Sequence, residues 1–268
     1  MTPFEITRGS SPVILGFPHT GTDVPPDIWA DLNAEGYKLR DTDWHVHTLY
    51  GGVLPEVTTV RATFHRYCID ANRDPSGASL YPGQNTTGLV PRTDFDDQPL
   101  WSRKPDGKEI ERRKALFHAP YHAALAAEIE RVKAIHGIAV LYDCHSIRSK
   151  CPFLFDDVLP DFNIGTDNGK TCAPEFERAV AGICRSADGH TSILNGRFRG
   201  GWTTRHYGKP ETGVHAVQME LAQSTHLESE ALPFAYDEAK ADRLRIHLGA
   251  ILKRLEGIAL STKTGAWS

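Results

Sequence analysis

The sequence has 268 residues, of which 40% are hydrophobic and 24% charged, a composition that is ordinary for a globular protein. Its formal net charge of −4 argues against nucleic acid or an anionic membrane surface as the main partner, and no segment has the ~18 consecutive apolar residues of a membrane span. Five cysteines without a C-x-x-C pair and an N-terminus without a signal-peptide pattern predict reduced thiols in a cytoplasmic protein.

Short apolar runs that end in polar clusters recur in the first part of the chain. Pro12–Phe17 predicts a buried strand, and His19 follows it. Val57–Phe64 predicts a second strand, and Tyr67–Ile69 predicts a shorter one that ends in the polar cluster Asp70–Pro75. Because ligands of open α/β sheets bind outside the carboxyl ends of strands, these polar residues are candidate site residues.

Between the first two strands, four potential metal ligands lie within seven residues. They are Asp41, Asp43, His45 and His47, and the apolar spacing after them predicts a loop that enters a helix. Two carboxylates and two imidazoles are costly to desolvate unless they pair or bind a cation. The alternative is a solvated helix N-terminus that is capped by an aspartate.

A long loop and a long helix lead to the central strand. Residues 75–107 are rich in Gly, Pro, Asn, Asp and Thr, and we interpret them as an ordered lid or wall of a site. From Glu109 the apolar spacing is helical until Gly137, and Pro120 either kinks this helix or begins its second half.

The segment Ile138–Ser149 contains the most informative junction of strand and polar cluster. Ile138–Tyr142 predicts a buried strand, and Asp143, His145 and Ser146 follow it. A histidine at such a strand end is a candidate ligand, although it can equally well bond nearby backbone.

The remaining elements complete an α/β pattern without a repeat or a linker, so one domain spanning residues 1–268 is predicted. Pro174–Arg185 predicts a helix, Ser192–Leu194 a strand, and Asn195–Gly208 a glycine-rich loop whose three arginines suit a small anion. Val214–Leu221 predicts the last strand, with Gln218 and Glu220 on one face and the apolar residues on the other. Asp237–Leu255 predicts a closing amphipathic helix with Asp237 as its N-cap.

These clusters together predict a catalytic metal site. His19, His145 and the Asp41–His47 group offer nitrogen and oxygen ligands without a cysteine pattern, which favours a catalytic zinc with an open position over a structural zinc. Iron, cobalt or manganese also suit such ligands. The chain lacks an H-E-x-x-H motif, so the zinc site of that helical type is excluded.

Other residues are candidates for the chemistry around the metal. Glu220 is a candidate general base for an activated water. Asn72 and Arg73 are candidates for binding a substrate carboxylate, since a guanidinium donates two parallel hydrogen bonds. The alternative for this segment is a structural ion pair between Asp70 and Arg73.

Eight short motifs follow one another along nearly the whole chain: PHTGT (Pro18–Thr22), DTDWH (Asp41–His45), IDANR (Ile69–Arg73), LYPGQNTTGL (Leu80–Leu89), DCHSIRS (Asp143–Ser149), LNGRFRGG (Leu194–Gly201), TRHYG (Thr204–Gly208) and HAVQMELAQ (His215–Gln223). In this order they resemble the N-formylglutamate amidohydrolase (deformylase) family. The family is similar to zinc carboxypeptidases and aspartoacylases in the arrangement of its catalytic residues. The resemblance therefore implies a mixed β-sheet flanked by helices, in a fold like that of these enzymes.

The resemblance also implies roles for matched positions. His19 and His145 correspond to metal ligands, Asn72 and Arg73 to the carboxylate-binding pair, and Glu220 to the catalytic glutamate. The carboxypeptidase-like pattern has a glutamate three residues after the first histidine, where this chain has Thr22. The carboxylate ligand is therefore assigned to Asp43, with Asp41, Asp23 and His45 as alternatives, and His47 is not counted as a ligand.

The function implied is zinc-dependent hydrolysis of N-formyl-L-glutamate to formate and L-glutamate, the last step of a histidine degradation route. We assign the second substrate carboxylate to Arg205, with Arg197 and Arg199 as alternatives. The other hypotheses are a deacylase for another N-acyl amino acid and a non-catalytic protein that binds an acidic ligand. Cys144 as a nucleophile beside His145 is disfavoured, because adjacent strand residues point to opposite faces.

Overall fold

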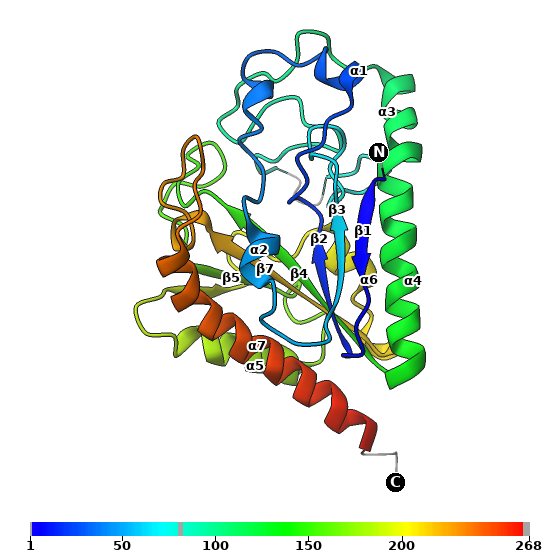
Figure 1. Cartoon of the computed structure of the whole chain (residues 1–268), viewed down its shortest axis with the longest axis vertical. Helices are drawn as coiled ribbons and strands as arrows, with labels where there is room; N and C mark the ends of the chain where they lie inside the picture. The colour runs from blue at the N-terminus through cyan, green and yellow to red at the C-terminus, as the bar shows by residue number, and fades with distance from the viewer. Residues whose placement is uncertain (1, 80–82, 265–268) are drawn as a thin grey trace.

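The computed structural model describes residues 2–79 and 83–264, and a mixed sheet of seven strands runs through this part of the chain (Figure 1). In the order in which they lie side by side, the strands are β1 (Phe4–Thr7), β3 (Thr58–Ala62), β2 (Val13–Phe17), β4 (Ala139–Ile147), β7 (Val214–Ala222), β5 (Phe162–Gly165) and β6 (Ser192–Leu194). Strands β3, β2, β4 and β7 are parallel, whereas β1 and β5 pair antiparallel with β3 and β7. The prediction of an α/β mixed sheet is confirmed.

Helices cover both faces of this sheet. The helical segments are α1 (Pro26–Trp29), α2 (Val46–Tyr50), α3 (Gly107–Arg113), a π-helical turn (Lys114–His118), α4 (Ala119–His136), α5 (Pro174–Arg185), α6 (Trp202–Tyr207) and α7 (Glu238–Thr264), with 3-10 turns at Gly36–Lys38, Pro210–Thr212 and Gln223–Thr225. Residues of α2, α5 and α7 share one apolar core with the sheet, and residues of α4 share the other. In Figure 1, α4 runs along one side of the sheet, and α5 and α7 lie on the opposite side.

Side-chain alternation along β4 explains why two cores form. Val140, Tyr142 and Cys144 point into the core with α5 and α7, whereas Ala139 and Leu141 point into the core with α4. All nine residues of β4 are buried, as a central parallel strand covered on both faces requires.

Several predicted boundaries agree with the structure. The predicted helix Pro174–Arg185 and strand Ser192–Leu194 are α5 and β6 with unchanged bounds. Asp237 precedes α7, and its carboxylate accepts a hydrogen bond from the amide of Lys240 at 2.9 Å, as an N-cap does. The loop before Val46 enters α2 as expected.

Three predictions about elements were wrong. Tyr67–Ile69 lies in a turn and the irregular segment after it, because its apolar side chains are buried in the core with α4 without a strand partner. The strand predicted as Ile138–Tyr142 continues to Ile147, because β7 pairs with it along its whole length, so His145 lies within the strand. The predicted loop Asn195–Gly208 contains α6. Strands β1 and β5 were not predicted, since four residues give too short a pattern.

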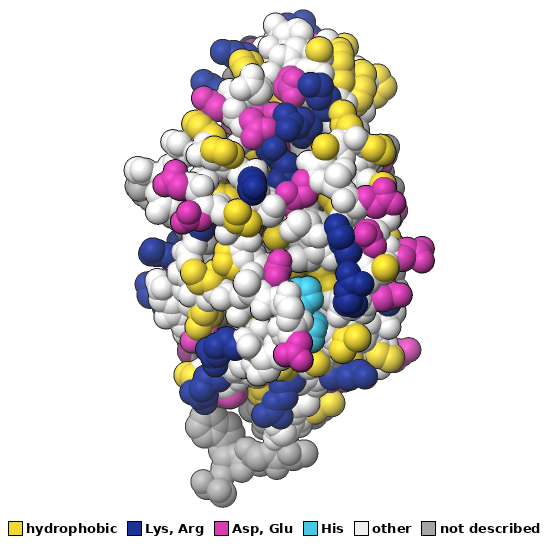
Figure 2. All heavy atoms as spheres, turned by 90° about the vertical axis from the view of Figure 1, so that its left-hand side faces the viewer, with side chains coloured by type: hydrophobic (Ala, Val, Ile, Leu, Met, Phe, Trp, Pro, Cys, Tyr) yellow, Lys and Arg dark blue, Asp and Glu magenta, His cyan; other side chains and the backbone are white. Residues whose placement is uncertain are grey.

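The surface carries mixed charge on one face, and the thiols are buried. On the face shown in Figure 2, Lys and Arg side chains are interspersed with Asp and Glu side chains, so this face carries both signs of charge. Among the described residues, no helix is long and apolar enough to cross a membrane. The five cysteines are unpaired and buried.

Candidate active site

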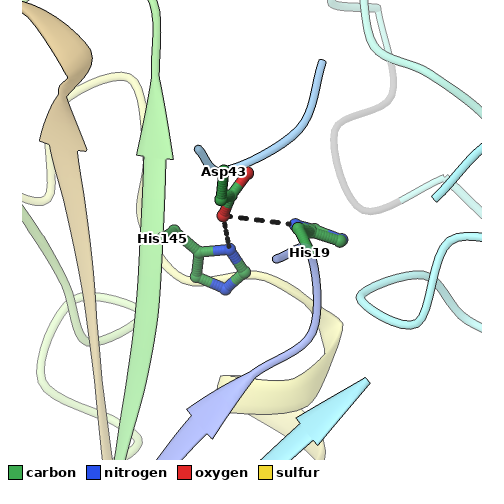
Figure 3. Close-up of side chains that lie close together, drawn as sticks. All are labelled: His19, Asp43 and His145. Atoms are coloured by element: carbon green, nitrogen blue, oxygen red, sulfur yellow. Dashed lines mark hydrogen bonds and ion pairs between the residues drawn. The ribbon is translucent and has the colours of Figure 1, made fainter. Parts of the chain in front are cut away.

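The carboxyl ends of β2 and β4 bring two histidines and an aspartate together (Figure 3). Gly16 of β2 pairs with Asp143 of β4, so His19 and His145, just beyond this pair, lie at the same edge of the sheet. Asp43, from the loop before α2, reaches between them: its Oδ2 lies 3.2 Å from Nδ1 of His145 and 3.7 Å from Nδ1 of His19. All three side chains are buried, and one ligand atom from each lies within 4.8 Å of the others.

Each imidazole has a second carboxylate at the ring nitrogen that points away from Asp43. Nε2 of His19 lies 2.7 Å from Oδ1 of Asp70, and Nε2 of His145 lies 3.1 Å from Oδ1 of Asp143. Histidines that bind metals usually donate their other N–H to a carboxylate or carbonyl, and the hydrogen bond between His19 and Asp70 fits this pattern. Nε2 of His145 makes an ion-pair contact with Asp143 and also lies 3.2 Å from Nδ2 of Asn72. Both rings direct Nδ1 toward Asp43.

Two atoms of the cluster are buried without a hydrogen-bond partner. They are Nδ1 of His19 and Oδ1 of Asp43, although this oxygen also forms an ion pair with the Arg66 guanidinium at 3.7 Å. Because buried polar atoms are nearly always paired, such atoms in a set of nitrogen and oxygen donors fit a bound cation. Two imidazoles and one carboxylate suit zinc, and also other divalent transition metals. The residues present therefore fit the metal that was predicted.

Charges around the cluster keep its carboxylates ionised. Burial opposes ionisation of Asp43, but the neighbouring His19 and His145 lower the pKa of its carboxyl below the usual range. Burial also opposes ionisation of Asp70, but Arg66, whose Nη2 lies 2.7 Å from Oδ2 of Asp70, holds the pKa of that carboxyl well below its usual value. Asp43 can thus act as an anionic ligand, and Asp70 as an anionic support for His19.

The predicted alternatives to Asp43 lie elsewhere. Oδ2 of Asp41 accepts a hydrogen bond from the amide of Phe95 at 3.1 Å, and Asp23 is exposed. Nε2 of His45 lies 3.0 Å from the carbonyl oxygen of Phe234. Among the described residues, Asp43 is the acidic side chain that groups with the two histidines.

A polar cavity opens beside the cluster, and Glu220 lines it from β7. Glu220 is the direct neighbour of His145 across the β4–β7 ladder, and Nε2 of Gln218 donates to Oε2 of Glu220 at 3.1 Å. Burial raises the pKa of Glu220 to about 8, with the Asp43 carboxylate adding to the shift and His145 opposing it. A carboxyl with a pKa near neutrality can both accept and return a proton.

Asn72 and Arg73, which the sequence analysis gave as candidates for substrate binding, line the same cavity. Nδ2 of Asn72 lies 3.2 Å from Nε2 of His145, and its Oδ1 accepts a hydrogen bond from the Thr203 amide at 2.9 Å. The Arg73 guanidinium donates to the carbonyl and the hydroxyl of Thr87 at 2.8 and 2.9 Å. These contacts fix both side chains at the cavity wall.

Two of the predicted loop arginines, Arg197 and Arg205, lie in different places relative to the cavity. Nε of Arg205 donates to the carbonyl of Gly200 at 2.9 Å and its Nη2 lies 3.6 Å from Asp167, so Arg205 is not among the described residues that line the cavity. Arg197 does line it, and its Nε donates to the carbonyl of Leu154 at 2.9 Å. The structure therefore brings Arg197, but not Arg205, to the predicted anion site.

Sequence reasoning missed Arg66 and the role of Asp70 as the partner of His19. Arg66 also lines the cavity. The four-residue spacing of Arg66 and Asp70 is a signal that was available, since it allows an ion pair on one side of a turn. Cys144, in contrast, points into the apolar core, and burial raises the pKa of its thiol well above the usual value.

The fold and this arrangement define an α/β protein with a candidate active site at the carboxyl ends of parallel strands. The chain belongs to the N-formylglutamate amidohydrolase family, whose family model matches residues 11–227. It is thus an amidohydrolase, as the motifs of the sequence led us to expect.

Relatives and solved structures agree with this assignment. The chain is 43% identical over 251 residues to an N-formylglutamate deformylase of Pseudomonas aeruginosa, covering 92% of this chain and 94% of the relative. It is 42% identical to an N-formylglutamate deformylase of Pseudomonas putida, with 92% and 93% covered. The crystal structure of an N-formylglutamate amidohydrolase from Ralstonia eutropha superimposes with a TM-score of 0.78 at 26% identity, covering 95% of this chain and 98% of the other. A gene product of Agrobacterium tumefaciens shares the fold, with a TM-score of 0.74 at 18% identity and 96% of both chains covered.

Proposed function

We propose that this protein hydrolyses N-formyl-L-glutamate to formate and L-glutamate, as one domain spanning residues 1–268 and as the last step of a histidine degradation route. The observation that carries the proposal is the cluster of His19, Asp43 and His145 beside Glu220, in a cavity lined by arginines. The names of the curated relatives support the same substrate.

We propose that His19, Asp43 and His145 hold a zinc ion. When bound, the metal supplies a Lewis acid that polarises the formyl oxygen and makes a water molecule more acidic. Two imidazoles near the carboxyl ends of parallel strands, together with the loop carboxylate of Asp43, also support a relation to the fold of zinc carboxypeptidases and aspartoacylases.

Glu220 is the proposed general base and acid. Its carboxylate takes a proton from the attacking water while the water oxygen bonds to the formyl carbon. When the carbon–nitrogen bond breaks, the same carboxyl returns this proton to the leaving amine. The second proton of the water, on the hydroxyl of formic acid, then passes to the amine, so that formate and glutamate with a protonated amino group are released. The raised pKa of Glu220, caused mainly by burial, supports both transfers.

Two cationic contacts are expected for a substrate with two carboxylates, since an unpaired buried carboxylate is costly. Asn72 and Arg73 are proposed for the α-carboxylate. For the side-chain carboxylate we now favour Arg197 over Arg205, because Arg197 lines the cavity. The buried Arg66 adds positive charge close to Asp43, with Nη1 lying 3.7 Å from Oδ1.

The direct test is a panel of N-formyl, N-acetyl and N-succinyl amino acids assayed by amine release, with metal analysis of the same sample. Hydrolysis of N-formylglutamate that EDTA abolishes and zinc restores supports the proposal. Preference for another acyl group would identify a different deacylase. Binding of acidic ligands without turnover at full metal occupancy would identify a binding protein.

Arg197→Ala is expected to raise the KM for N-formylglutamate roughly 10- to 100-fold, the usual effect of losing a charge-assisted hydrogen bond. The KM for N-formylalanine, which has no side-chain carboxylate, should change much less. Arg205→Ala is the matched variant outside the cavity and should affect both substrates equally. If Arg205→Ala alone discriminates between the substrates, the side-chain carboxylate binds at Arg205.

Asp70→Asn is expected to weaken metal binding roughly 10- to 100-fold, because Asp70 orients His19 and increases its basicity. Competition with a fluorescent chelator measures this affinity directly. Asp31→Asn, which removes an aspartate that pairs with the exposed Arg103, is the control and should leave metal affinity unchanged. Equal affinities for Asp70→Asn and the native protein would show that Asp70 does not support a ligand.

A further inference from the structure

Two buried histidines near the site have no role in the reaction described above. His118 ends the π-helical turn and His122 lies one turn later in α4, so both rings are on one face of the helix, with centroids 4.4 Å apart. Their exposed fractions are 3% and 8%. Neither is among the described residues that line the cavity, so any effect on the reaction must pass through another part of the chain.

Both imidazoles contact the backbone of the segment that carries Asn72. Nε2 of His118 lies 3.0 Å from the carbonyl oxygen of Arg73, and Nε2 of His122 lies 2.7 Å from that of Ala71. An imidazole nitrogen that contacts a carbonyl oxygen must carry the proton. Burial lowers the pKa of both histidines, that of His122 to about 3, so each ring is neutral and uses its single N–H for this bond.

Helix α6 packs on the same histidines and also reaches Asn72. The Trp202 ring lies 4.7 Å from the ring of His122, and the Tyr207 hydroxyl lies 3.1 Å from Nδ1 of His122. At the start of this helix the Thr203 amide donates to Oδ1 of Asn72. A Cβ atom at Gly201 would overlap the Asn72 amide, so the approach of α6 to this side chain leaves no spare room.

We propose that His118 and His122 are positioning residues that hold the Ala71–Arg73 backbone from both sides of Asn72 and so place Asn72 and Arg73 for substrate binding. This inference rests on the proposed function, in which Asn72 and Arg73 hold the α-carboxylate. The π-helical turn ends at His118, and such turns frequently occur at functional sites.

The consequence of losing one donor follows from the tight packing. A buried carbonyl without a partner is costly, so the Ala71–Arg73 segment would shift to find a new donor. Such a shift moves the Asn72 amide, 3.2 Å from His145, and the Arg73 guanidinium at the cavity wall. The metal ligands themselves make no contact with His118 or His122 among the hydrogen bonds of the described residues.

The test compares His122→Leu with His122→Gln in the zinc-loaded full chain. His122→Leu should raise the KM for N-formylglutamate roughly tenfold with a smaller change in kcat, as the loss of one buried hydrogen bond predicts. His122→Gln places an amide N–H near the position of Nε2 and should restore most of the loss. Zinc content should stay equal in all variants.

A matched control separates positioning from general stability. His136, in the last turn of the same helix, has its Nε2 2.8 Å from the carbonyl oxygen of Ser10, far along the chain from the site. His136→Leu should leave KM and kcat unchanged. If His122→Leu only lowers the melting temperature and leaves both kinetic constants as in the native enzyme, the pair is merely structural and the inference is overturned.

Amide hydrogen exchange provides a readout that does not depend on activity. In His122→Leu, exchange should become faster in peptides covering residues 70–74 and 202–207, and should stay unchanged elsewhere in the sheet. Unchanged exchange in these peptides overturns the inference. If the native protein fails to hydrolyse N-formylglutamate, the proposed function is overturned, while the exchange result still decides whether the pair holds the segment.

Discussion

Replacing His145 with alanine is expected to remove the bound metal and to lower activity by roughly 10³-fold or more. A metal acting as a Lewis acid contributes several kcal/mol to catalysis, and each 1.36 kcal/mol is a factor of ten in rate. The fold should survive, because the two apolar cores on either side of the sheet do not include this side chain. Metal analysis and thermal unfolding of the same sample measure both effects.

Two further variants distinguish loss of the metal from misfolding of the protein. His145→Gln keeps a polar group between Asp43 and Asp143 and so lowers the cost of leaving these buried carboxylates unpaired. His215 is a buried histidine near the start of β7, whereas the site lies near the end of this strand. His215→Ala should therefore keep metal and activity. Full metal occupancy in both His145 variants would place the metal elsewhere.

Replacing Glu220 with glutamine is expected to lower kcat roughly 10²- to 10⁴-fold, the usual contribution of a general base. Glutamine keeps the shape of the side chain but cannot accept a proton. Zinc content and the affinity for the product glutamate should therefore remain close to those of the native enzyme. Steady-state kinetics, metal analysis and calorimetric titration with glutamate measure these three quantities.

The control for Glu220 is Glu228→Gln, which changes an exposed glutamate in the loop that follows β7. It should leave all three quantities unchanged. Turnover close to native in Glu220→Gln would identify another group as the base, and Asp143, beside His145, would be the next candidate to replace.

The sequence by itself determined those parts of the protein that depend on local periodicity. Alternation in Val214–Leu221 predicted that Gln218 and Glu220 face away from the apolar core, and in the structure both line the cavity. The apolar runs before His19 and His145 predicted that both lie near the carboxyl ends of strands; His19 follows β2, His145 lies in the last third of β4, and the two side chains meet. Successive side chains of a strand point to opposite faces, so the sequence of one strand predicts their directions without knowledge of the neighbouring strands.

Only the tertiary structure decided which side chains reach the site from loops. Asp43 joins the histidines, whereas Asp41 bonds the Phe95 amide, although the two aspartates are two residues apart in the same loop. Arg197 lines the cavity and Arg205 does not, because α6 forms within the predicted loop and directs Arg205 toward Asp167. Such choices depend on the path of the backbone through contacts between residues far apart in sequence, and no local pattern encodes that path.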